Sequence, residues 1–214
     1  MIDSNNPTQK MSNQERVAYC KNKYEGVVFK SENYGEFIIT KYNNALDVDI
    51  KFLKTNFESK IEISQARKGK VKDYSLPLVR NIGIVGRRIK KGESKIIIDT
   101  WNNMLGRVYC ESYLNKNTSY KKVTIHKEWL CFSNFEKWYL KNKPKNKNIK
   151  YNLDKDLLSG KHLIYSPSTC CFLPEEINLA IRKNIKNRKS NAIILADKYK
   201  NDISKKVYKA LLKL

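Results

Sequence analysis

The sequence has no long hydrophobic run, and this absence bears first on where the protein resides. No apolar stretch among its 214 residues approaches the roughly 20 residues that a helix needs to cross a bilayer. The N-terminal stretch MIDSNNPTQKMSNQERVAYC is polar and lacks the pattern of a secretory signal, a charged segment followed by an apolar one. We therefore expect a soluble protein of the cytoplasm with no membrane partner.

Cysteine pairs with metal-binding spacing are also lacking. The five cysteines, an odd number, include no C-x-x-C pair. An odd count without a secretion signal argues against a disulfide framework, so we expect reduced and mostly buried thiols. A zinc site built from four scattered residues stays open as an alternative: Cys110, Cys131, His126 and Cys170.

Acidic residues are scarce relative to basic ones. The sequence has 43 Lys and Arg against 21 Asp and Glu, which gives a formal net charge of +22 at pH 7. Such an excess suits a polyanionic partner, because binding releases the counterions condensed on a nucleic acid. The excess is steeper after Trp101, with dense runs at 141–150 and 182–189. We expect a nucleic-acid partner; a general bias of the composition toward lysine is the competing interpretation.

Hydrophobic patterning predicts an α+β protein. Strand-like runs fill residues 27–63, and the clearest alternates apolar and polar positions: Leu46, Val48, Ile50 and Phe52 share one side. We expect a small antiparallel β-sheet domain followed by a helical and ββα domain that ends in amphipathic helices. The predicted boundaries are a polar N-terminal segment at 1–23 with a short helix around Gln14 to Lys23, the sheet domain at 24–75, a Gly-rich basic linker at 76–98, the ββα domain at 99–189 and a C-terminal helical segment at 190–214.

Apolar residues at helical spacing predict the helices of the second half. Four of them predict a helix that begins near Thr100: Trp101, Met104, Leu105 and Val108. Residues 133–136 predict a capping box for an aromatic-rich helix. Pro174 is expected at the first position of the next helix, with one face formed by Ile177, Ile181 and Ile185. Residues 191–214 predict an amphipathic hairpin, broken near 201–202, or a single helix.

The stretch from Leu153 to Asn178 contains the candidate catalytic residues. It reads as a strand, a short Gly/His hairpin, a second strand and a helix. This order can bring Asp154 and Asn178 together at one divalent metal such as Mg²⁺. Lys155 follows Asp154, where ββα-metal nucleases usually place the histidine that activates water, and lysine is protonated at neutral pH unless desolvated. His162, at the tip of the hairpin, is the alternative base. Solvated turn carboxylates are the competing interpretation.

Basic residues in three parts of the chain are candidate phosphate contacts. The predicted exposed face of the sheet carries Lys41, Lys51 and Lys54, and a basic sheet can lie in a major groove. Arg87 and Arg88 stand in the linker. The dense runs after Trp101 contribute Lys143, Lys145, Lys147, Arg182, Lys183 and Lys186. A solvated surface without a ligand is the alternative in each case.

Several spaced motifs resemble one family. The segment from Trp101 to Asn178 contains W-x-x-M-L, E-W-x-x-F-x-x-F and Y-S-P-x-x-C in that order, together with LDKDLL and EEIN. In this it resembles the phage-borne HNH homing-endonuclease-like proteins that often carry an APETALA2-type DNA-binding domain. Residues 24–86, with GEFIITKY and GIVG, resemble the small β-domain that precedes the nuclease region in those proteins.

The resemblance implies a position for each catalytic residue of the family. The metal-ligand aspartate falls on Asp154, the general-base histidine on Lys155, the central asparagine on Thr169 and the final asparagine on Asn178. Two of the four residues are therefore replaced. The APETALA2-type module expected after Asn178 is missing, because the basic linker leads almost directly to ADKYKNDISKKVYKALL.

Two hypotheses follow. The first is an HNH-like homing endonuclease of a phage or mobile element, which binds double-stranded DNA in the bacterial cytoplasm and nicks it with Mg²⁺ or another divalent metal. The second is a catalytically inactive DNA-binding protein of a phage, with a regulatory, virion-associated or genome-packaging role. RNA stays open as a ligand, as do a homodimer and a phage protein partner.

Overall fold

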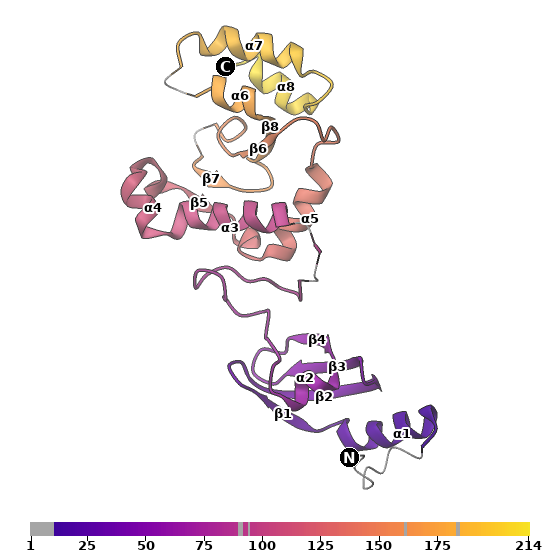
Figure 1. The fold of residues 1–214 in the computed structure, drawn as a ribbon. Helices are drawn as coiled ribbons and strands as arrows, with labels where there is room; N and C mark the ends of the chain where they lie inside the picture. Colours follow the sequence, from indigo (N-terminus) through magenta and orange to yellow (C-terminus); the bar gives the residue numbers. More distant parts are fainter. Residues whose placement is uncertain (1–10, 90–91, 94, 161, 183–184) are drawn as a thin grey trace, which may run out of the picture. The chain divides into compact units, whose positions relative to one another are not determined.

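The computed structural model describes residues 11–89, 92–93, 95–160, 162–182 and 185–214. Over these residues it shows the expected α+β class, with an antiparallel four-stranded sheet followed by a helical region that contains small sheets (Figure 1). The chain folds into two compact units. We call Met1–Leu76 with Gly86–Arg88 the N-terminal unit, and Pro77–Val85 with Ile89–Leu214 the C-terminal unit. No helix in the described part is long and apolar enough to cross a membrane.

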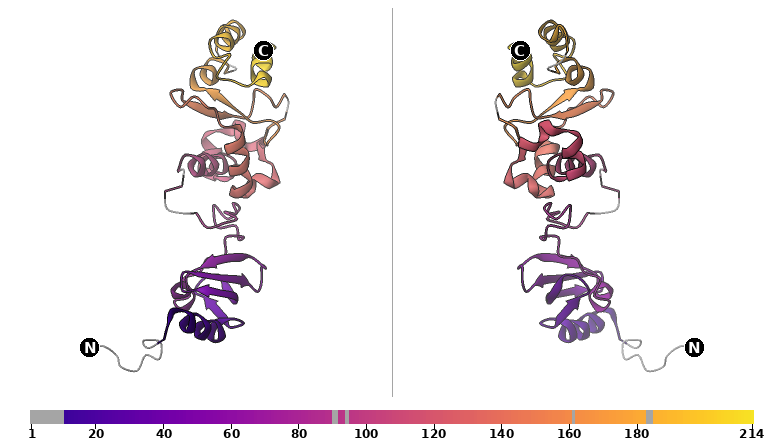
Figure 2. Two further views of the ribbon diagram at one scale, coloured as in Figure 1. Left: turned by 90° about the vertical axis from the view of Figure 1, so that its right-hand side faces the viewer. Right: turned by 90° about the vertical axis from the view of Figure 1, so that its left-hand side faces the viewer.

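The N-terminal unit is built on one sheet with the strand order β1-β2-β3-β4, in which all neighbours are antiparallel. Its strands are β1 (Val28–Ser31), β2 (Gly35–Asn44), β3 (Asp47–Phe52) and β4 (Glu58–Ile61). Helix α1 (Asn13–Tyr24) starts with a capping box between Ser12 and Glu15 and lies against β2 (Figure 2). Helix α2 (Ile63–Arg67) follows β4. The helix predicted near the N-terminus is therefore confirmed.

Alternation along the strands builds the core of this unit. Val48, Ile50 and Phe52 are buried as predicted, and they pack with Phe37, Ile39 and Tyr42 of β2. The prediction is wrong at Leu46, which is 75% exposed because it lies in the turn between β2 and β3. It is also wrong at Ile63, which begins α2 instead of continuing a strand.

The first half of the C-terminal unit is helical. Its elements are α3 (Lys95–Tyr109), α4 (Glu111–Lys116), η2 (Thr118–Lys122), β5 (Thr124–Ile125), η3 (Lys127–Leu130) and α5 (Phe132–Asn142). The predicted apolar stripe of α3 is buried, and Trp101 Nε1 donates a hydrogen bond of 2.7 Å to the Trp129 carbonyl oxygen. Gly83 lies beneath this stripe, since a Cβ atom there would be 2.6 Å from Leu105 and 2.8 Å from Trp101. Two aromatic helices and the preceding loop therefore share one core.

Two helix starts differ from the predictions. α3 begins at Lys95 rather than near Thr100. The capping box predicted from Ser133 is wrong, because α5 has Cys131 as its N-cap and the Ser133 hydroxyl donates to the Val85 carbonyl oxygen instead. A tertiary partner for the hydroxyl has replaced the local one.

The second half of the C-terminal unit contains the candidate site. Its elements are β6 (Tyr151–Asp154), β7 (Ile164–Tyr165), β8 (Cys171–Pro174), α6 (Glu175–Ala180), α7 (Arg188–Lys198) and α8 (Lys205–Leu211). The Gly/His hairpin predicted here is wrong. β6 pairs antiparallel with β8, whereas β7 pairs in parallel with β5. The long loop between β6 and β8 thus reaches back to the first half of the unit.

The last helices form a second core with β8. Pro174 is the N-cap of α6 and not its first helical residue, so the helix begins at Glu175, one residue later than predicted. Ile177 and Ile181 are buried there, but Ile185 is 38% exposed and does not continue the face. Residues 191–214 form the predicted hairpin rather than one helix, with a break between Lys198 and Lys205.

Candidate functional site

Two antiparallel strands, β6 and β8, and the helix α6 surround the predicted site, but β7 lies between the two strands in sequence, where a hairpin of consecutive strands was predicted. Asp154, the last residue of β6, lies opposite Cys171 of β8, and α6 starts directly after β8. Asn178 lies in α6 and is half-buried. The two predicted ligands are thus placed on β6 and on α6 of one small ββα arrangement.

Asp154 stabilises the turn that follows β6. Its Oδ1 atom accepts the backbone N–H groups of Asp156, at 3.0 Å, and of Leu157, at 2.8 Å. The residue is buried, and this burial raises the pKa of its carboxyl group above the usual value despite the two hydrogen bonds. One oxygen of the carboxylate is therefore already used twice by the protein itself.

Lys155 is a buried cation. Its side chain is 7% exposed, and its Nζ atom lies 2.5 Å from Oδ1 of Asp156. The same atom lies 5.2 Å from the ring centroid of Tyr120 and 5.7 Å from that of Tyr165. An ion pair and the faces of two aromatic rings can stabilise an ammonium group that has little contact with water. In this form the group has three donors and no acceptor, so it cannot take a proton from water.

Thr169 is buried, and its hydroxyl is used in hydrogen bonds within the protein. Its hydroxyl donates to the Ile164 carbonyl oxygen at 2.7 Å and accepts from the Ser166 backbone N–H at 3.1 Å. The Ser166 hydroxyl lies 2.8 Å from it. Both residues are buried, so this Ser-Pro turn is a closed hydrogen-bond network that stabilises the loop between β7 and β8.

His162 is exposed in the loop between β6 and β7, where its backbone N–H donates to the Ser159 carbonyl oxygen at 3.0 Å. Over the described residues, no hydrogen bond joins the side chain of His162 or Asn178 to Asp154. The sequence-based assignment of His162 as a base and of Asn178 as a metal ligand stays a prediction.

The donors present fit a divalent metal poorly. Mg²⁺ and Ca²⁺ require several oxygen ligands, yet Asp154 shares one of its oxygens with two backbone amides and its neighbour is an ammonium group. Within the described ranges, no group of three or more His, Cys, Asp and Glu side chains could hold a metal ion. The same finding contradicts the alternative zinc site at Cys110, Cys131, His126 and Cys170. The three cysteines of that set are free thiols.

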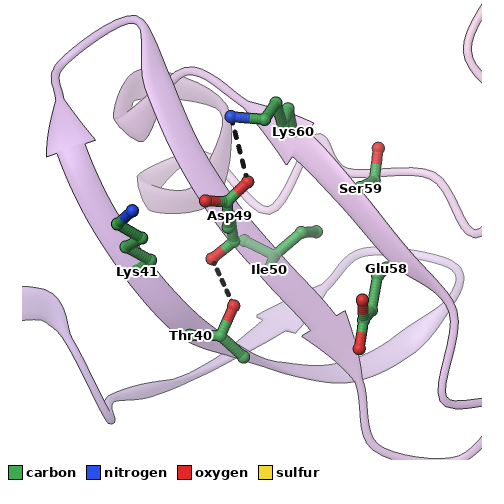
Figure 3. A pocket seen from close by; sticks show the side chains of 7 residues that line it. All are labelled: Thr40, Lys41, Asp49, Ile50, Glu58, Ser59 and Lys60. Carbon is green, nitrogen blue, oxygen red and sulfur yellow. Dashed lines mark hydrogen bonds and ion pairs between the residues drawn. The ribbon is translucent and has the colours of Figure 1, made fainter.

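The exposed face of the N-terminal sheet carries basic residues that have acidic neighbours. Seven residues line a shallow pocket on it (Figure 3): Thr40, Lys41, Asp49, Ile50, Glu58, Ser59 and Lys60. Lys60 Nζ lies 2.7 Å from Asp47 Oδ1 and 3.3 Å from Asp49 Oδ1, and the hydrogen bond from Lys60 lowers the pKa of Asp47. Lys51 is the cross-strand partner of Glu58. On this face Lys60 is therefore paired with carboxylates, and Lys51 has an acidic cross-strand neighbour.

Basic residues of the C-terminal unit are arranged differently. Lys143, Lys145 and Lys147 are all exposed in the segment between α5 and β6, and none has an ion pair within the described part of the chain. Arg182 and Lys186 are exposed between α6 and α7. These side chains are free to meet a ligand's phosphates.

The other predicted phosphate contacts vary in exposure. Lys54 is exposed after β3, whereas Lys51 is half-buried. Arg87 is half-buried and donates to the carbonyl oxygen of exposed Arg88 at 3.0 Å. Lys183 lies outside the described residues.

Sequence reasoning missed the partners of Lys155. Tyr120 and Tyr165 come from η2 and β7, which are far apart along the chain, and no periodic pattern relates either of them to Lys155. The only available signal was the Y-S-P-x-x-C motif, which singled out Tyr165 without indicating its contact.

Comparison of the chain with models of known protein families, with curated proteins and with solved structures finds no match.

Proposed function

We propose that this protein binds double-stranded DNA through the phosphate backbone, mainly with its C-terminal unit, and that it does not cleave the DNA. One observation carries the binding: the C-terminal unit has 28 Lys and Arg against 11 Asp and Glu, and within the described residues its exposed loop lysines Lys143, Lys145 and Lys147 form no ion pair. Such cations release condensed counterions from a duplex, and this release drives association.

The choice of DNA is supported by the resemblance of residues 101–178 to phage HNH homing-endonuclease-like proteins. The antiparallel pair of β6 and β8 with α6 directly after it supports this choice, and β7 is the strand that departs from the expected hairpin. A protein of this kind would serve a phage as a regulatory protein, as a virion-associated protein or as a genome-packaging protein.

The absence of cleavage is inferred from three side chains. Asp154 caps a turn, Lys155 is a buried ammonium paired with Asp156, and Thr169 closes an internal network. Each interaction stabilises the fold, and none leaves a group that could activate water. On this proposal a catalytic arrangement has been retained as a scaffold.

The test is a pair of assays on one preparation. Fluorescence anisotropy with a labelled DNA duplex, repeated at several salt concentrations, should give an affinity that falls steeply and linearly on a log-log plot. The affinity should be no higher in Mg²⁺ than in EDTA, because the interface needs no metal and Mg²⁺ competes for the phosphates. Salt-independent binding, or no binding, would contradict the proposal, and tighter binding to an RNA duplex would redirect it to RNA.

An active endonuclease is the second candidate, and the ββα order of β6, β8 and α6 favours it. Supercoiled plasmid incubated with Mg²⁺ or Mn²⁺ tests for it, with Asp154→Asn as the matched control. This substitution keeps an oxygen that can accept the two backbone hydrogen bonds but removes the negative charge. Nicking by the wild type and not by the variant would establish the nuclease and overturn our proposal.

A further inference from the structure

The segment between α5 and β6 is hydrogen-bonded to the turn between α7 and α8. Asn146 Nδ2 donates to Asp202 Oδ1 at 2.9 Å, and Asn146 Oδ1 accepts the backbone N–H of Asn148 at 3.0 Å. The hydroxyl of Tyr151 donates to the Asp202 carbonyl oxygen at 3.4 Å. Asn146 and Asp202 are both half-buried, in contrast to the lysines around them. Two segments that are remote in sequence are thus joined at one point.

This junction gathers lysines from both segments. Lys143, Lys145 and Lys147 flank Asn146, while Lys200 and Lys205 flank Asp202; all five are exposed. No ion pair neutralises any of them within the described ranges, although Lys200 lies over the Tyr208 ring at 5.7 Å.

The acidic groups nearby make hydrogen bonds or ion pairs of their own. Asp202 Oδ1 accepts from Asn146, and Asp197 accepts from the Tyr208 hydroxyl. Glu175 pairs with Lys150 at 2.7 Å. Asp202 and Asp197 keep their negative charge, because their hydrogen-bond donors are neutral, but the five lysines outnumber these two carboxylates and give the junction a positive balance.

We propose that Lys143, Lys145, Lys147, Lys200 and Lys205 form one phosphate-binding surface for duplex DNA, which we call the junction surface. Asn146 and Asp202 are its positioning residues. This inference rests on the proposed DNA binding and adds the place on the C-terminal unit where the DNA backbone lies. It also assigns the α7–α8 turn to binding, where sequence motifs gave no indication.

The hydrogen bond matters because it orders the surface before binding. A free cationic loop loses conformational freedom when it meets the DNA, and this loss weakens the complex. A loop already fixed through Asn146 avoids part of that loss. Asn146 therefore acts on affinity without contributing any charge.

Charge removal is the first test. We would compare the triple variant Lys143→Gln, Lys145→Gln, Lys147→Gln with a matched control in which exposed lysines of α4, η2 and η3 are replaced: Lys116→Gln, Lys122→Gln, Lys127→Gln. For the junction variant, the magnitude of the salt slope should fall by up to roughly 3, about 0.9 per phosphate contact, and affinity near physiological salt should fall about 10- to 100-fold. The control should lose less than about threefold. Equal losses would mean that binding follows the overall charge and would overturn the junction surface.

Positioning is tested without removing positive charge. Asn146→Ala should weaken binding about three- to tenfold with an unchanged salt slope, because the same phosphates are still contacted after the loop is ordered. Asp202→Asn keeps an acceptor for Asn146 and removes a negative charge, so it should bind at least as tightly as the wild type. Asn146→Ala added to the triple lysine variant should cause no further loss.

Melting curves show whether each variant is folded. If Asn146→Ala unfolds the protein, Asp202→Asn and the lysine variants still test the junction surface. The lysines are exposed, and Asn at position 202 keeps an oxygen that accepts the hydrogen bond from Asn146. Undiminished affinity of the triple lysine variant, or a further loss when Asn146→Ala is added to it, would overturn the proposal. No binding by the wild type would instead show that the proposed function itself has failed.

Discussion

The two units carry their positive charge in different ways. The N-terminal unit has 15 Lys and Arg against 10 Asp and Glu, whereas the C-terminal unit has 28 against 11. On the N-terminal sheet, antiparallel register sets Lys60 opposite Asp49 and Lys51 opposite Glu58. In the loops of the C-terminal unit no register supplies such partners. Net charge alone therefore does not identify a nucleic-acid surface; the local pairing of each lysine has to be known.

The C-terminal unit also separates two kinds of cation. Lys155 is buried and paired with Asp156, whereas Lys143, Lys145 and Lys147 are exposed and unpaired within the described chain. The first kind is suited to stabilise the fold and the second to bind a ligand. Mutations at the two kinds should consequently change different observables.

The largest expected effect contrasts the sheet with the loop. Replacing Lys41, Lys51 and Lys54 with Gln should lower DNA affinity less than about threefold, whereas the same change at the three loop lysines lowers it about 10- to 100-fold. Anisotropy titrations of both triple variants, at matched salt, measure the difference. A greater loss for the sheet variant would reverse the comparison and return the binding site to the N-terminal unit.

The next effect concerns stability and leaves DNA binding alone. Asp154→Ala removes the acceptor of two backbone N–H groups at a buried turn and should cost about 2 kcal/mol of unfolding free energy. The salt slope of DNA binding should not change. Urea denaturation and anisotropy on the same variant give both numbers, and a changed slope would show that Asp154 faces the nucleic acid.

A smaller effect depends on pH. The folded-state pKa of Asp154 is raised by burial, so the unfolded chain releases this proton first as the pH increases. The stability that the protonated carboxyl contributes is present below its unfolded pKa and is lost as the pH rises through the folded value. Asp154→Asn has no such loss and should gain stability relative to the wild type as the pH rises from the usual carboxyl range, near 4, toward neutrality. Parallel stability curves for the two proteins would contradict this.

The smallest effect belongs to the paired charges of the sheet. Lys60→Gln breaks an exposed ion pair with Asp47 and Asp49, and such pairs contribute little to stability. We expect nearly the same Tm as the wild type and a DNA affinity changed less than about twofold. Calorimetry and anisotropy would measure the two quantities. A large loss of affinity would show that Lys60 contacts DNA in spite of its pairing.

The regular elements could be predicted from sequence because their periods are local. Alternation gave the strand through Val48, Ile50 and Phe52, and helical spacing gave the buried stripe of Trp101 and Met104. No such period exists for β7, which has only two residues and pairs with β5 in the first half of the unit.

The side-chain environments could be predicted less well. Lysine is ordinarily an exposed residue, so the burial of Lys155 between two tyrosines depends on tertiary packing that no neighbouring residue indicates. The hydrogen bond from Asn146 to Asp202 joins loops whose composition suggests only solvation. In both cases the decisive contact links distant segments.

The short stretch before α3 limits how this protein can be cut into pieces. Pro77–Val85 belongs to the C-terminal unit, where the Ile84 backbone N–H donates to the Leu130 carbonyl oxygen and the Ile84 carbonyl oxygen accepts from Phe132, both at 2.8 Å. Gly86–Arg88 nevertheless belongs to the N-terminal unit, where the Gly86 N–H donates to the Tyr74 carbonyl oxygen. A complete C-terminal fragment must begin at Pro77, and a complete N-terminal fragment must extend to Arg88. Intact fragments of the two units therefore overlap in sequence, and a single proteolytic cut between these residues deprives at least one unit of part of its chain.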